Sequence, residues 1–345
     1  IAVWMAIAAA GFVAALFAYE TGRAAGHIAI SVYLYLAAFI FASFVARNPA
    51  RHAKIILDAY LVAALAAAIA GIAGYFDVFP GAGEALTLHG RASGTFKDPN
   101  VLGSFLVPAL VYVVHLWLEQ PGRRAVLAAG AGGVLALAVL LTFSRGAWAA
   151  ALVALAIHWY LSMAAATTGR QRLKLMAMPI AGGLAGLLVI GAAVQSDEVA
   201  DLLDERASLT QSYDVGAEGR FGGQLRALEM IVENPLGIGA LEFTPGLLVD
   251  GVRMPKVSEG RSMGDDVHNS YLTMFLSSGW LGGLLYIAII AATIAFGFAH
   301  ALKRTATRPL FLVAYAALTA ILLEGLVIDI DHWRHVHLLL GLVWG

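Results

Sequence analysis

Apolar residues fall in long runs along most of this chain, and short polar segments separate the runs. Runs of about 20 apolar residues can cross a bilayer as α-helices, whose backbone groups bond within their own segment. The pattern predicts nine spans and a partial tenth, and therefore an all-α, polytopic transmembrane helical bundle. The runs are Ile1–Tyr19, Ile28–Ala46, Ile55–Phe76, Val101–Leu118, Ala125–Phe143, Ala147–Ala165, Leu175–Val194, Trp280–Ala299, Leu310–Ile328 and the partial Val336–Gly345.

These runs divide the chain into three predicted regions. Residues 1–194 hold seven spans, residues 195–268 form a long polar loop, and residues 269–345 hold the remaining spans, with the last one incomplete. Because the chain begins and ends inside apolar runs, we expect both ends to be incomplete.

Composition supports a membrane protein and excludes several kinds of chemistry. The 345 residues are 60% hydrophobic and 13% charged, whereas a soluble domain carries about 25% charged residues. The absence of cysteine excludes disulfides and thiol catalysis. No P-loop, G-x-S-x-G or H-E-x-x-H is present, so ATP-driven transport, serine hydrolysis and zincin chemistry have no support.

Basic residues gather in alternate loops, and this asymmetry predicts the orientation. The loops that carry them are expected to be cytoplasmic. The opposite side would hold Asp77–Asn100, Ser144–Gly146, Gln195–Val267 and Asp329–His335, and in the inner membrane of a bacterium it faces the periplasm. The basic residues are Arg47, Arg51, Lys54, Arg123, Arg124, Arg170, Arg172, Lys174, Lys303, Arg304 and Arg308.

The Gln195–Val267 loop is too long for a simple connection. Asp197–Ser208 has early acids and a late arginine, which predicts an amphipathic helix on the membrane surface. Phe221–Asn234 predicts a second helix, which Pro235 ends. Pro245–Gly264 is rich in glycine and proline and is expected to be a mobile flap.

The stretch that closes this loop carries the main candidate chemistry. Asp266 is predicted to cap a helix that begins near Val267, with His268 in its first turn. Asp265 could orient the imidazole, Asn269 adds a donor and an acceptor, and Ser277–Gly279 is expected to interrupt the helix. A helix N-terminus disfavours imidazolium, so His268 could accept a proton. Two interpretations stay open: a general base at the membrane surface, or a capping histidine at the interface.

Three arginines, Arg91, Arg145 and Arg220, lie on the same predicted side as His268. The guanidinium fork matches phosphate oxygens well, so the three could converge on a diphosphate. Taken singly, each arginine is more simply explained by snorkelling or by a surface ion pair. Because all three lie on the same predicted side of the membrane as His268, the diphosphate interpretation is favoured.

Two further polar features lie near the C-terminus. Asp329–His337 holds two aspartates and three histidines, but their spacing matches no familiar zinc or calcium pattern. A polar cap between two helix ends is the favoured interpretation, and metal binding is the alternative. Glu324 lies inside a predicted span, where we expect it to pair with an arginine or a histidine of another helix.

The pattern H-N, nine residues, G-x-x-G, formed by His268, Asn269, Gly279 and Gly282, resembles the signature of bacterial O-antigen ligases. The same signature marks the related O-antigen polymerases and protein O-oligosaccharyltransferases. The upstream stretches GRASGTFKDPNVLG, LTFSRGAWAA and GRFGGQLRALEMIVENPLGIGALEF are similar too. The resemblance covers the chain from Arg91 to the C-terminus and does not separate ligase from polymerase.

The resemblance implies a metal-independent, inverting, membrane-embedded glycosyltransferase without a cofactor. Its donor would be a glycan on undecaprenyl diphosphate, and its acceptor a lipid A core sugar or a growing glycan, with no nucleic-acid partner. By position, Arg145 and Arg220 would bind the diphosphate, His268 would activate the acceptor hydroxyl, and Arg91 would be a further phosphate contact.

A non-catalytic subunit and a transporter are the two alternative classes of function. The short chain could be a non-catalytic membrane subunit of a larger assembly. A transporter would need polar residues inside its spans, and apart from Glu324 these runs are nearly free of charge. The transferase is therefore the favoured hypothesis.

Overall fold

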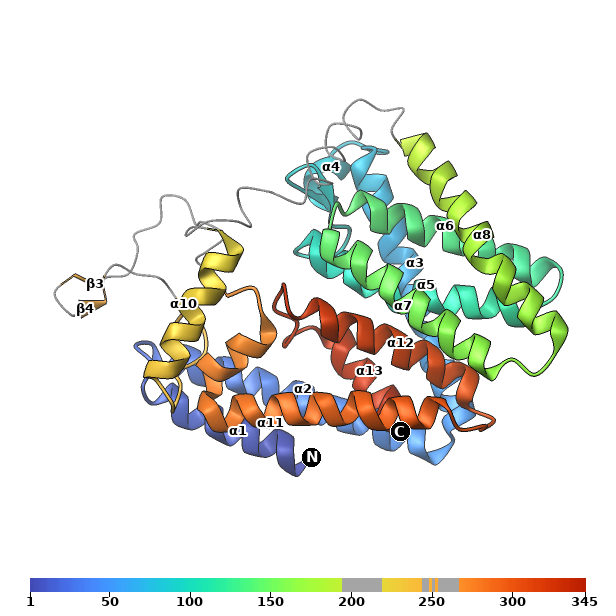
Figure 1. Ribbon diagram of the computed structural model, residues 1–345. Helices are drawn as coiled ribbons and strands as arrows, with labels where there is room; N and C mark the ends of the chain where they lie inside the picture. The colour runs from blue at the N-terminus through green and yellow to red at the C-terminus, as the bar shows by residue number, and fades with distance from the viewer. Residues whose placement is uncertain (194–218, 244–247, 250–251, 254–266) are drawn as a thin grey trace. The chain divides into compact units, whose positions relative to one another are not determined.

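The computed structural model describes residues 1–193, 219–243, 248–249, 252–253 and 267–345 (Figure 1). Asp265, Asp266, the predicted helix Asp197–Ser208 and most of the predicted flap Pro245–Gly264 lie outside these ranges. The expectations for those residues stay predictions.

Helices make up nearly all of the described structure, and all the long ones except the helix that begins at Arg220 overlap the predicted apolar runs. The long ones are α1 (Ala2–Ala15), α2 (Thr21–Arg47), α3 (Pro49–Tyr75), α5 (Pro99–Glu119), α6 (Arg123–Leu141), α7 (Arg145–Ala165), α8 (Gly169–Ala193), α10 (Arg220–Glu233), α11 (Ser270–Ala301), α12 (Arg308–Glu324) and α13 (Arg334–Trp344). Among the described residues, six of them (α2, α3, α5, α6, α7 and α11) are long and apolar enough to cross a membrane. The predicted polytopic helical membrane protein is confirmed.

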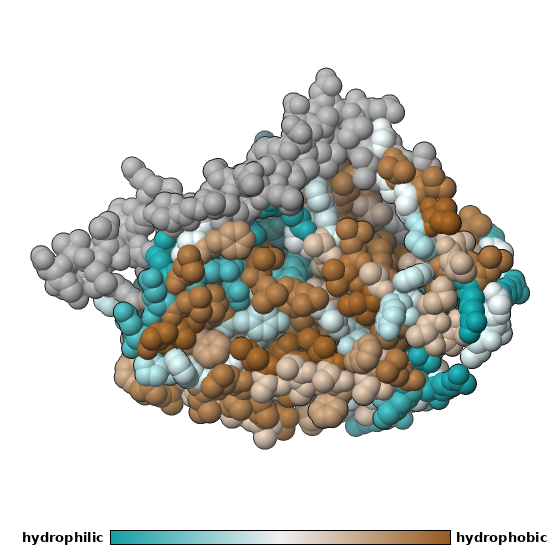
Figure 2. All heavy atoms as spheres, in the orientation of Figure 1, coloured by the Kyte–Doolittle hydropathy of each residue, from teal (hydrophilic) through white to brown (hydrophobic). Residues whose placement is uncertain are grey.

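The surface of these helices is apolar where a soluble protein would be polar. Large side chains such as Val62, Leu152 and Phe296 are 68%, 70% and 76% exposed. Hydrophobic side chains cover much of the face shown in Figure 2. Apolar surface on this scale is costly in water and suits contact with lipid.

The chain folds as two compact units, each assembled from separate segments. The first unit comprises Ile1–Ile40, Leu209–Ala295 and Gly325–His337. The second unit comprises Phe41–Ser208, Phe296–Glu324 and Leu338–Gly345. The three predicted regions (1–194, 195–268 and 269–345) are consecutive stretches of the chain, so they differ in kind from these two units. They remain a prediction about membrane topology.

Helix α5 forms the core of the second unit, where it packs against α3, α6, α7 and α12. Asp98 begins the helix by accepting a hydrogen bond from the Asn100 amide at 2.6 Å, directly before Pro99. Most α5 side chains are buried, and the Tyr112 hydroxyl donates to Asp58 of α3 at 2.6 Å. This core fixes the ends of α5, α6 and α7 relative to one another.

The loop between α3 and α5 contains structure that the apolar pattern did not predict. A short helix, α4 (Ala82–Leu86), precedes two antiparallel strands, β1 (Thr87–Leu88) and β2 (Arg91–Ala92). The two residues between the strands, His89 and Gly90, have φ angles of 52° and 69°. Positive φ at both positions is typical of the tightest hairpin turn, whose twist matches that of the strands. A second pair of short strands, β3 (Leu248–Val249) and β4 (Val252–Arg253), lies in the first unit.

Candidate functional site

Helix α11 begins later than the sequence predicted. Its first residue is Ser270, and the side-chain oxygen of Asn269 accepts from the amides of Tyr271 and Leu272 at 3.0 and 3.2 Å. Asn269 is therefore the capping residue of α11, and the predicted start of this helix near Val267 is wrong. His268 lies just before the helix in the left-handed region, with φ 47°. Histidine adopts this conformation more often than most residues, but it still needs support from its surroundings.

That support comes from the segment that follows α12. The Ser270 amide donates to the Gly325 carbonyl at 2.9 Å, and the Asn269 side chain donates to the Leu326 carbonyl at 3.0 Å. The Ser270 hydroxyl accepts from the Ile330 amide at 2.6 Å. Asn269 and Ser270 are both buried, so these bonds are shielded from water. The backbone on both sides of His268 is thereby fixed by residues distant in sequence.

Helix α10 completes the support and links His268 to Arg220. The side-chain amide of Gln224 donates to the carbonyls of His268 and Leu326, each at 3.2 Å. Arg220 is the first residue of α10, and Gln224 lies one helical turn later on the same face. An apolar cluster of Ala227, Ile231, Ile238, Val267 and Leu276 holds this helix against the start of α11. The structure therefore brings Arg220 and His268 to neighbouring segments of one unit.

The predicted interruption of α11 is confirmed at Ser278 and Gly279. Gly279 has φ 65°, and a Cβ added there would lie 2.7 Å from the backbone of Pro235 and Leu236. The loop after α10 fills the break: the Ile238 amide donates to the Leu276 carbonyl at 2.8 Å, and the Trp280 amide donates to the Pro235 carbonyl at 2.9 Å. Only glycine permits this conformation together with so close an approach.

A cavity of about 180 Å³ lies beside the start of α11, within the first unit. Val267, the residue before His268, lines it together with Thr273 and Ser277 of α11. Arg23, His27, Asp329 and Asp331 give it a polar wall. The site thus combines a space next to His268 with groups that can form hydrogen bonds to a hydroxylated ligand.

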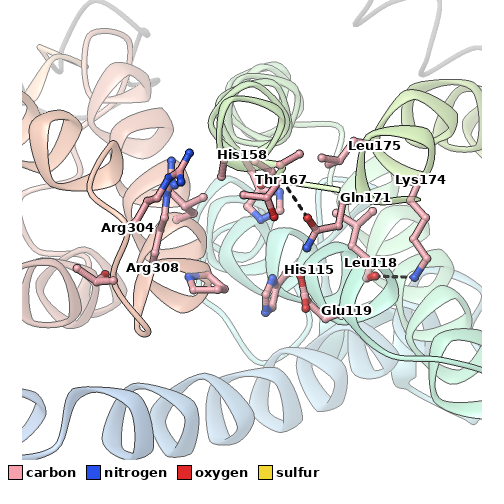
Figure 3. A pocket seen from close by; sticks show the side chains of 16 residues that line it. His115, Leu118, Glu119, His158, Thr167, Gln171, Lys174, Leu175, Arg304 and Arg308 are labelled. Carbon is pink, nitrogen blue, oxygen red and sulfur yellow. Dashed lines mark hydrogen bonds between the residues drawn. The ribbon is translucent and has the colours of Figure 1, made fainter. Parts of the chain in front are cut away.

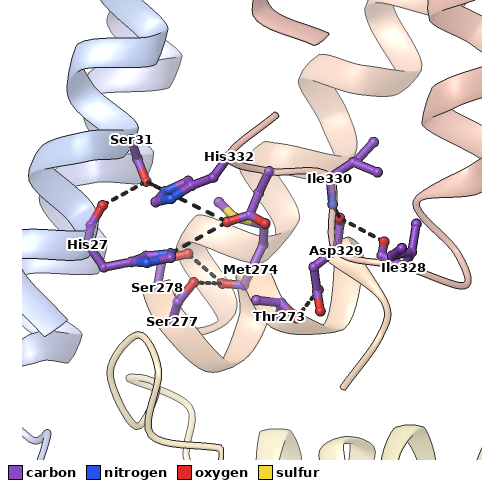
Figure 4. A network of polar contacts seen from close by, with 12 residues as sticks. His27, Ser31, Thr273, Met274, Ser277, Ser278, Ile328, Asp329, Ile330 and His332 are labelled. Atoms are coloured by element: carbon purple, nitrogen blue, oxygen red, sulfur yellow. Dashed lines mark hydrogen bonds and ion pairs between the residues drawn. The ribbon is translucent and has the colours of Figure 1, made fainter. Parts of the chain in front are cut away.

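Part of this polar wall is a network that joins α2 to the segment between α12 and α13 (Figure 4). Asp331 lies 3.5 Å from His27 Nε2 and 3.9 Å from His332 Nε2, and His332 bonds to the Ser31 hydroxyl at 2.8 Å. Burial opposes ionisation of Asp331, but the hydrogen bond from His27 and the charges of His332 and His27 outweigh it and lower its pKa. Burial lowers the pKa of His332, which Asp331 opposes in part. An ionised Asp331 carboxylate is therefore the expected state.

Arg145 lies in the second unit, at the predicted tight turn between α6 and α7. Helix α6 ends at Leu141, Phe143 has φ 47°, and α7 begins at Arg145. The Ser144 hydroxyl caps α7 by accepting from the Ala147 amide at 3.3 Å. Arg145 is therefore held at a helix N-terminus, a position where backbone N–H groups and the helix dipole favour anions.

Arg91 lies close to this turn, also in the second unit. Its Nε donates to the Thr142 carbonyl at 2.7 Å, and its Nη2 donates to the Asn100 side chain at 2.9 Å. These two bonds tie the β1–β2 hairpin to the end of α6 and the start of α5. Arg91 thus has a structural role in addition to the phosphate contact predicted for it.

The predicted site residues consequently fall into two groups. Arg220, His268 and Asn269 belong to the first unit, whereas Arg91 and Arg145 belong to the second. Within each unit the structure brings its members close together. The predicted meeting of all three arginines around one diphosphate stays a prediction.

Comparison with known proteins adds a decisive observation. Residues 130–287 match the family model described as O-Antigen ligase. The chain carries an O-antigen ligase domain. No curated protein and no solved structure shows a significant match to the chain. The family resemblance predicted from the H-N and G-x-x-G pattern is confirmed over these residues.

The O-antigen ligase domain contains Arg145, Arg220, His268 and the helix break at Gly279, whereas Arg91 precedes it. The structure shows which contacts two of the signature residues, Asn269 and Gly279, make. Asn269 caps α11 and bonds to the segment after α12, and Gly279 admits the backbone of the loop after α10. Two of the four signature residues therefore shape the backbone around His268.

Sequence reasoning missed several polar neighbours of the candidate site. Gln224 carried a usable signal, because it lies four residues after Arg220 on a predicted helix. Arg23 and His27 had none, since more than 200 residues separate them from His268. The partner predicted for Glu324 was an arginine or a histidine, whereas among the described residues Ser104 of α5 donates to its carboxylate at 2.8 Å.

The histidines of the Asp329–His337 segment allow the metal interpretation to be weighed. Ligand atoms of His27, Asp331 and His332 all lie within 4.8 Å of one another. However, the two imidazole rings are stacked, with centroids 3.8 Å apart and planes at 19°. Imidazole nitrogens bind metals in the ring plane, and the lone pairs of two stacked rings lie in two separate, nearly parallel planes, which disfavours a shared ion. The geometry favours the hydrogen-bonded polar cap.

Proposed function

We propose that this protein transfers a glycan from an undecaprenyl-diphosphate carrier to an acceptor hydroxyl, in the manner of an O-antigen ligase. The observation that carries the proposal is the Gln224 side chain, which holds the backbone of His268 one helical turn from Arg220. A proton acceptor and a diphosphate ligand would then stand on adjoining segments of one unit. The O-antigen ligase domain over residues 130–287 supports the same class of reaction.

The proposed reaction is a single displacement at the anomeric carbon. The acceptor oxygen forms the new bond to that carbon while the bond to the diphosphate oxygen breaks, which inverts the configuration. His268 takes the proton of the acceptor hydroxyl, and the undecaprenyl diphosphate leaves with the electron pair. A positioned base contributes about 10²- to 10⁴-fold to such a step.

The leaving diphosphate gains negative charge, and fixed cations can stabilise it as the charge develops. We assign this role to Arg220 and, by family resemblance, to Arg145, with Arg91 as a further contact. Each of Arg145 and Arg220 is the first residue of its helix, where backbone N–H groups also favour an anion. Because the diphosphate is already an activated leaving group, the proposed reaction needs no nucleotide and no metal.

Orientation is part of the proposal. The loops rich in lysine and arginine are assigned to the cytoplasm, so the start of α11 would face the periplasm. The lipid-linked donor would reach this site from the outer leaflet. Labelling of single cysteines placed in the otherwise cysteine-free chain would test this assignment, because a membrane-impermeant thiol reagent should reach position 89 and not position 123 in intact cells.

The function itself is tested with purified protein and an undecaprenyl-diphosphate-linked glycan. Separate reactions contain a lipid A core acceptor or a second lipid-linked glycan, and gel mobility reports the product. Transfer to the core supports a ligase, and extension of the lipid-linked glycan supports the polymerase alternative. If a folded preparation consumes no donor with either acceptor, the enzymatic proposal fails and a non-catalytic subunit becomes the better explanation.

A further inference from the structure

A second cavity, of about 360 Å³, lies in the second unit among the ends of α5, α7, α8 and α12 (Figure 3). Its volume is in the range of small-molecule sites. Its lining includes three cationic side chains, Lys174, Arg304 and Arg308, and one carboxylate, Glu119. The cavity lies where three of the four basic loops predicted to be cytoplasmic begin or end. None of the predicted transferase residues lines it.

Arg308 is the informative residue of this cavity. It is only 8% exposed, and its Nε is buried without a hydrogen-bond partner among the described residues. Within the same described part of the chain, no carboxylate forms an ion pair with it. A buried guanidinium with an unused donor is costly unless something supplies an acceptor. Arg308 also begins α12, so the helix dipole adds to the positive potential.

The other polar groups are placed to add to this potential. Lys174 donates to the Leu118 carbonyl at 2.7 Å, which uses one of its three donors and holds its ammonium at the cavity. His158 is buried, and its Nδ1 has no hydrogen-bond partner among the described residues. His115 lies beside it, with the ring centroids 6.2 Å apart. In Figure 3 Arg304 and Arg308, just before and at the start of α12, lie on one side of the cavity, and Lys174 of α8 lies on the other.

We propose that this cavity binds a phosphate group, held by Arg308 and Arg304 with Lys174 on the opposite side. A phosphate supplies the acceptor oxygens that the buried guanidinium lacks, and the arginine fork matches it in shape. Leu118, Leu175 and Leu312 give the same cavity an apolar wall. Basic pockets between membrane helices at the cytoplasmic face are typical sites for anionic lipid headgroups. This site is separate from the proposed transferase site and does not depend on that function.

The phosphate can come from a phospholipid headgroup or from a soluble phosphate compound, and two probes separate these sources. The full chain is purified in neutral detergent and titrated with inorganic phosphate. In parallel it is titrated with mixed micelles of phosphatidylglycerol, with phosphatidylcholine as the zwitterionic comparison. Arg308→Gln and Arg304→Gln are each expected to weaken binding of the effective probe about tenfold.

Two variants serve as controls. Arg124→Gln removes an exposed arginine at the start of α6 that does not line the cavity, and it should bind as the wild type does. Arg308→Lys keeps the buried charge and tests whether loss of binding by Arg308→Gln reflects misfolding. If Arg308→Gln does not fold, Arg304→Gln decides, since Arg304 is exposed.

Each outcome has a definite meaning. Selective binding of phosphatidylglycerol identifies a lipid headgroup site, and binding of inorganic phosphate alone identifies a soluble ligand. The proposal is overturned if neither probe binds, if phosphatidylcholine binds equally well, or if Arg124→Gln weakens binding as much as Arg304→Gln does.

Discussion

Arg145 and Arg220 occupy the same kind of position in the two units, since each is the first residue of a helix, but they are held differently. The α7 start is fixed locally, by the Ser144 cap and the left-handed Phe143 directly before it. The α10 start has no side-chain cap, and its helix is fixed by apolar packing and by the Gln224 bonds to distant carbonyls. One proposed anion site therefore lies in a local turn, and the other depends on tertiary structure.

This difference predicts how the two parts of the molecule should respond to substitutions elsewhere in the chain. A local turn keeps its geometry when remote residues change, because its bonds span only a few residues. The start of α11, in contrast, depends on Gln224, on Gly325 and Leu326, and on the loop that enters the break at Gly279. We expect substitutions far from His268 in sequence to disturb it.

The largest expected effect comes from the arginines themselves. Arg220→Ala and Arg145→Ala should each lower the rate of glycan transfer by about 10²- to 10³-fold, the usual cost of losing one group that stabilises developing charge. Lysine at either position should restore only part of the rate, because it lacks the bidentate fork. Initial rates with a lipid-linked donor measure both effects. A full rate for either alanine variant would remove that arginine from the diphosphate site.

Gly279→Ala should be the most damaging change to the stability of the first unit. Alanine at φ 65° and ψ −173° costs about 1–3 kcal/mol, and its Cβ would also meet the backbone of Pro235 and Leu236 at 2.7 Å. Thermal unfolding in detergent measures the loss. Gly130→Ala in α6 is the matched control, since nothing lies within 4 Å of the added Cβ. Equal stability of the two variants would contradict the close approach at the helix break.

The two capping residues offer a sharper test of local against distant support. Ser144→Ala should cost about 1 kcal/mol, the usual value of one cap. Asn269→Ala should cost more, because the same side chain also donates to the Leu326 carbonyl. Chemical unfolding of both variants gives the comparison. A cost for Asn269→Ala no greater than that for Ser144→Ala would argue that the Leu326 bond contributes nothing.

The smallest effect concerns pH and is confined to the first unit. Because burial lowers the pKa of His332, the unfolded chain takes up this proton more readily than the folded chain does. The contribution to stability is complete above the usual histidine pKa of 6.5 and decreases as the pH falls below it. Asp331, whose pKa is also lowered, adds a loss in more acidic solution. His332→Gln should flatten the decline of the unfolding temperature just below pH 6.5. An unchanged decline would refute the lowered pKa assigned to His332.

Much of the fold could be predicted from the sequence, because runs of apolar residues permit few alternatives in a bilayer. Local signals also placed the α6–α7 turn, the helix after residue 220 and the break at Gly279. The start of α11 was misplaced because Asp266, Val267 and His268 look like a cap and first turn. The bonds from Gln224 and Leu326, which favour a start at Ser270, join residues far apart in sequence. The cavity beside Arg308 was missed for the same reason, since four helices contribute to it.

The most direct test of the account compares two histidines at opposite ends of α11. His268 precedes α11 and is assigned as the base, whereas His300 lies in its last turn and packs against Phe311. Glycan transfer is measured in membranes that contain equal amounts of folded His268→Ala or His300→Ala protein. We predict a loss of about 10²-fold or more for His268→Ala and a near wild-type rate for His300→Ala. Full activity of the His268→Ala protein would contradict the central claim that this imidazole accepts the acceptor's proton.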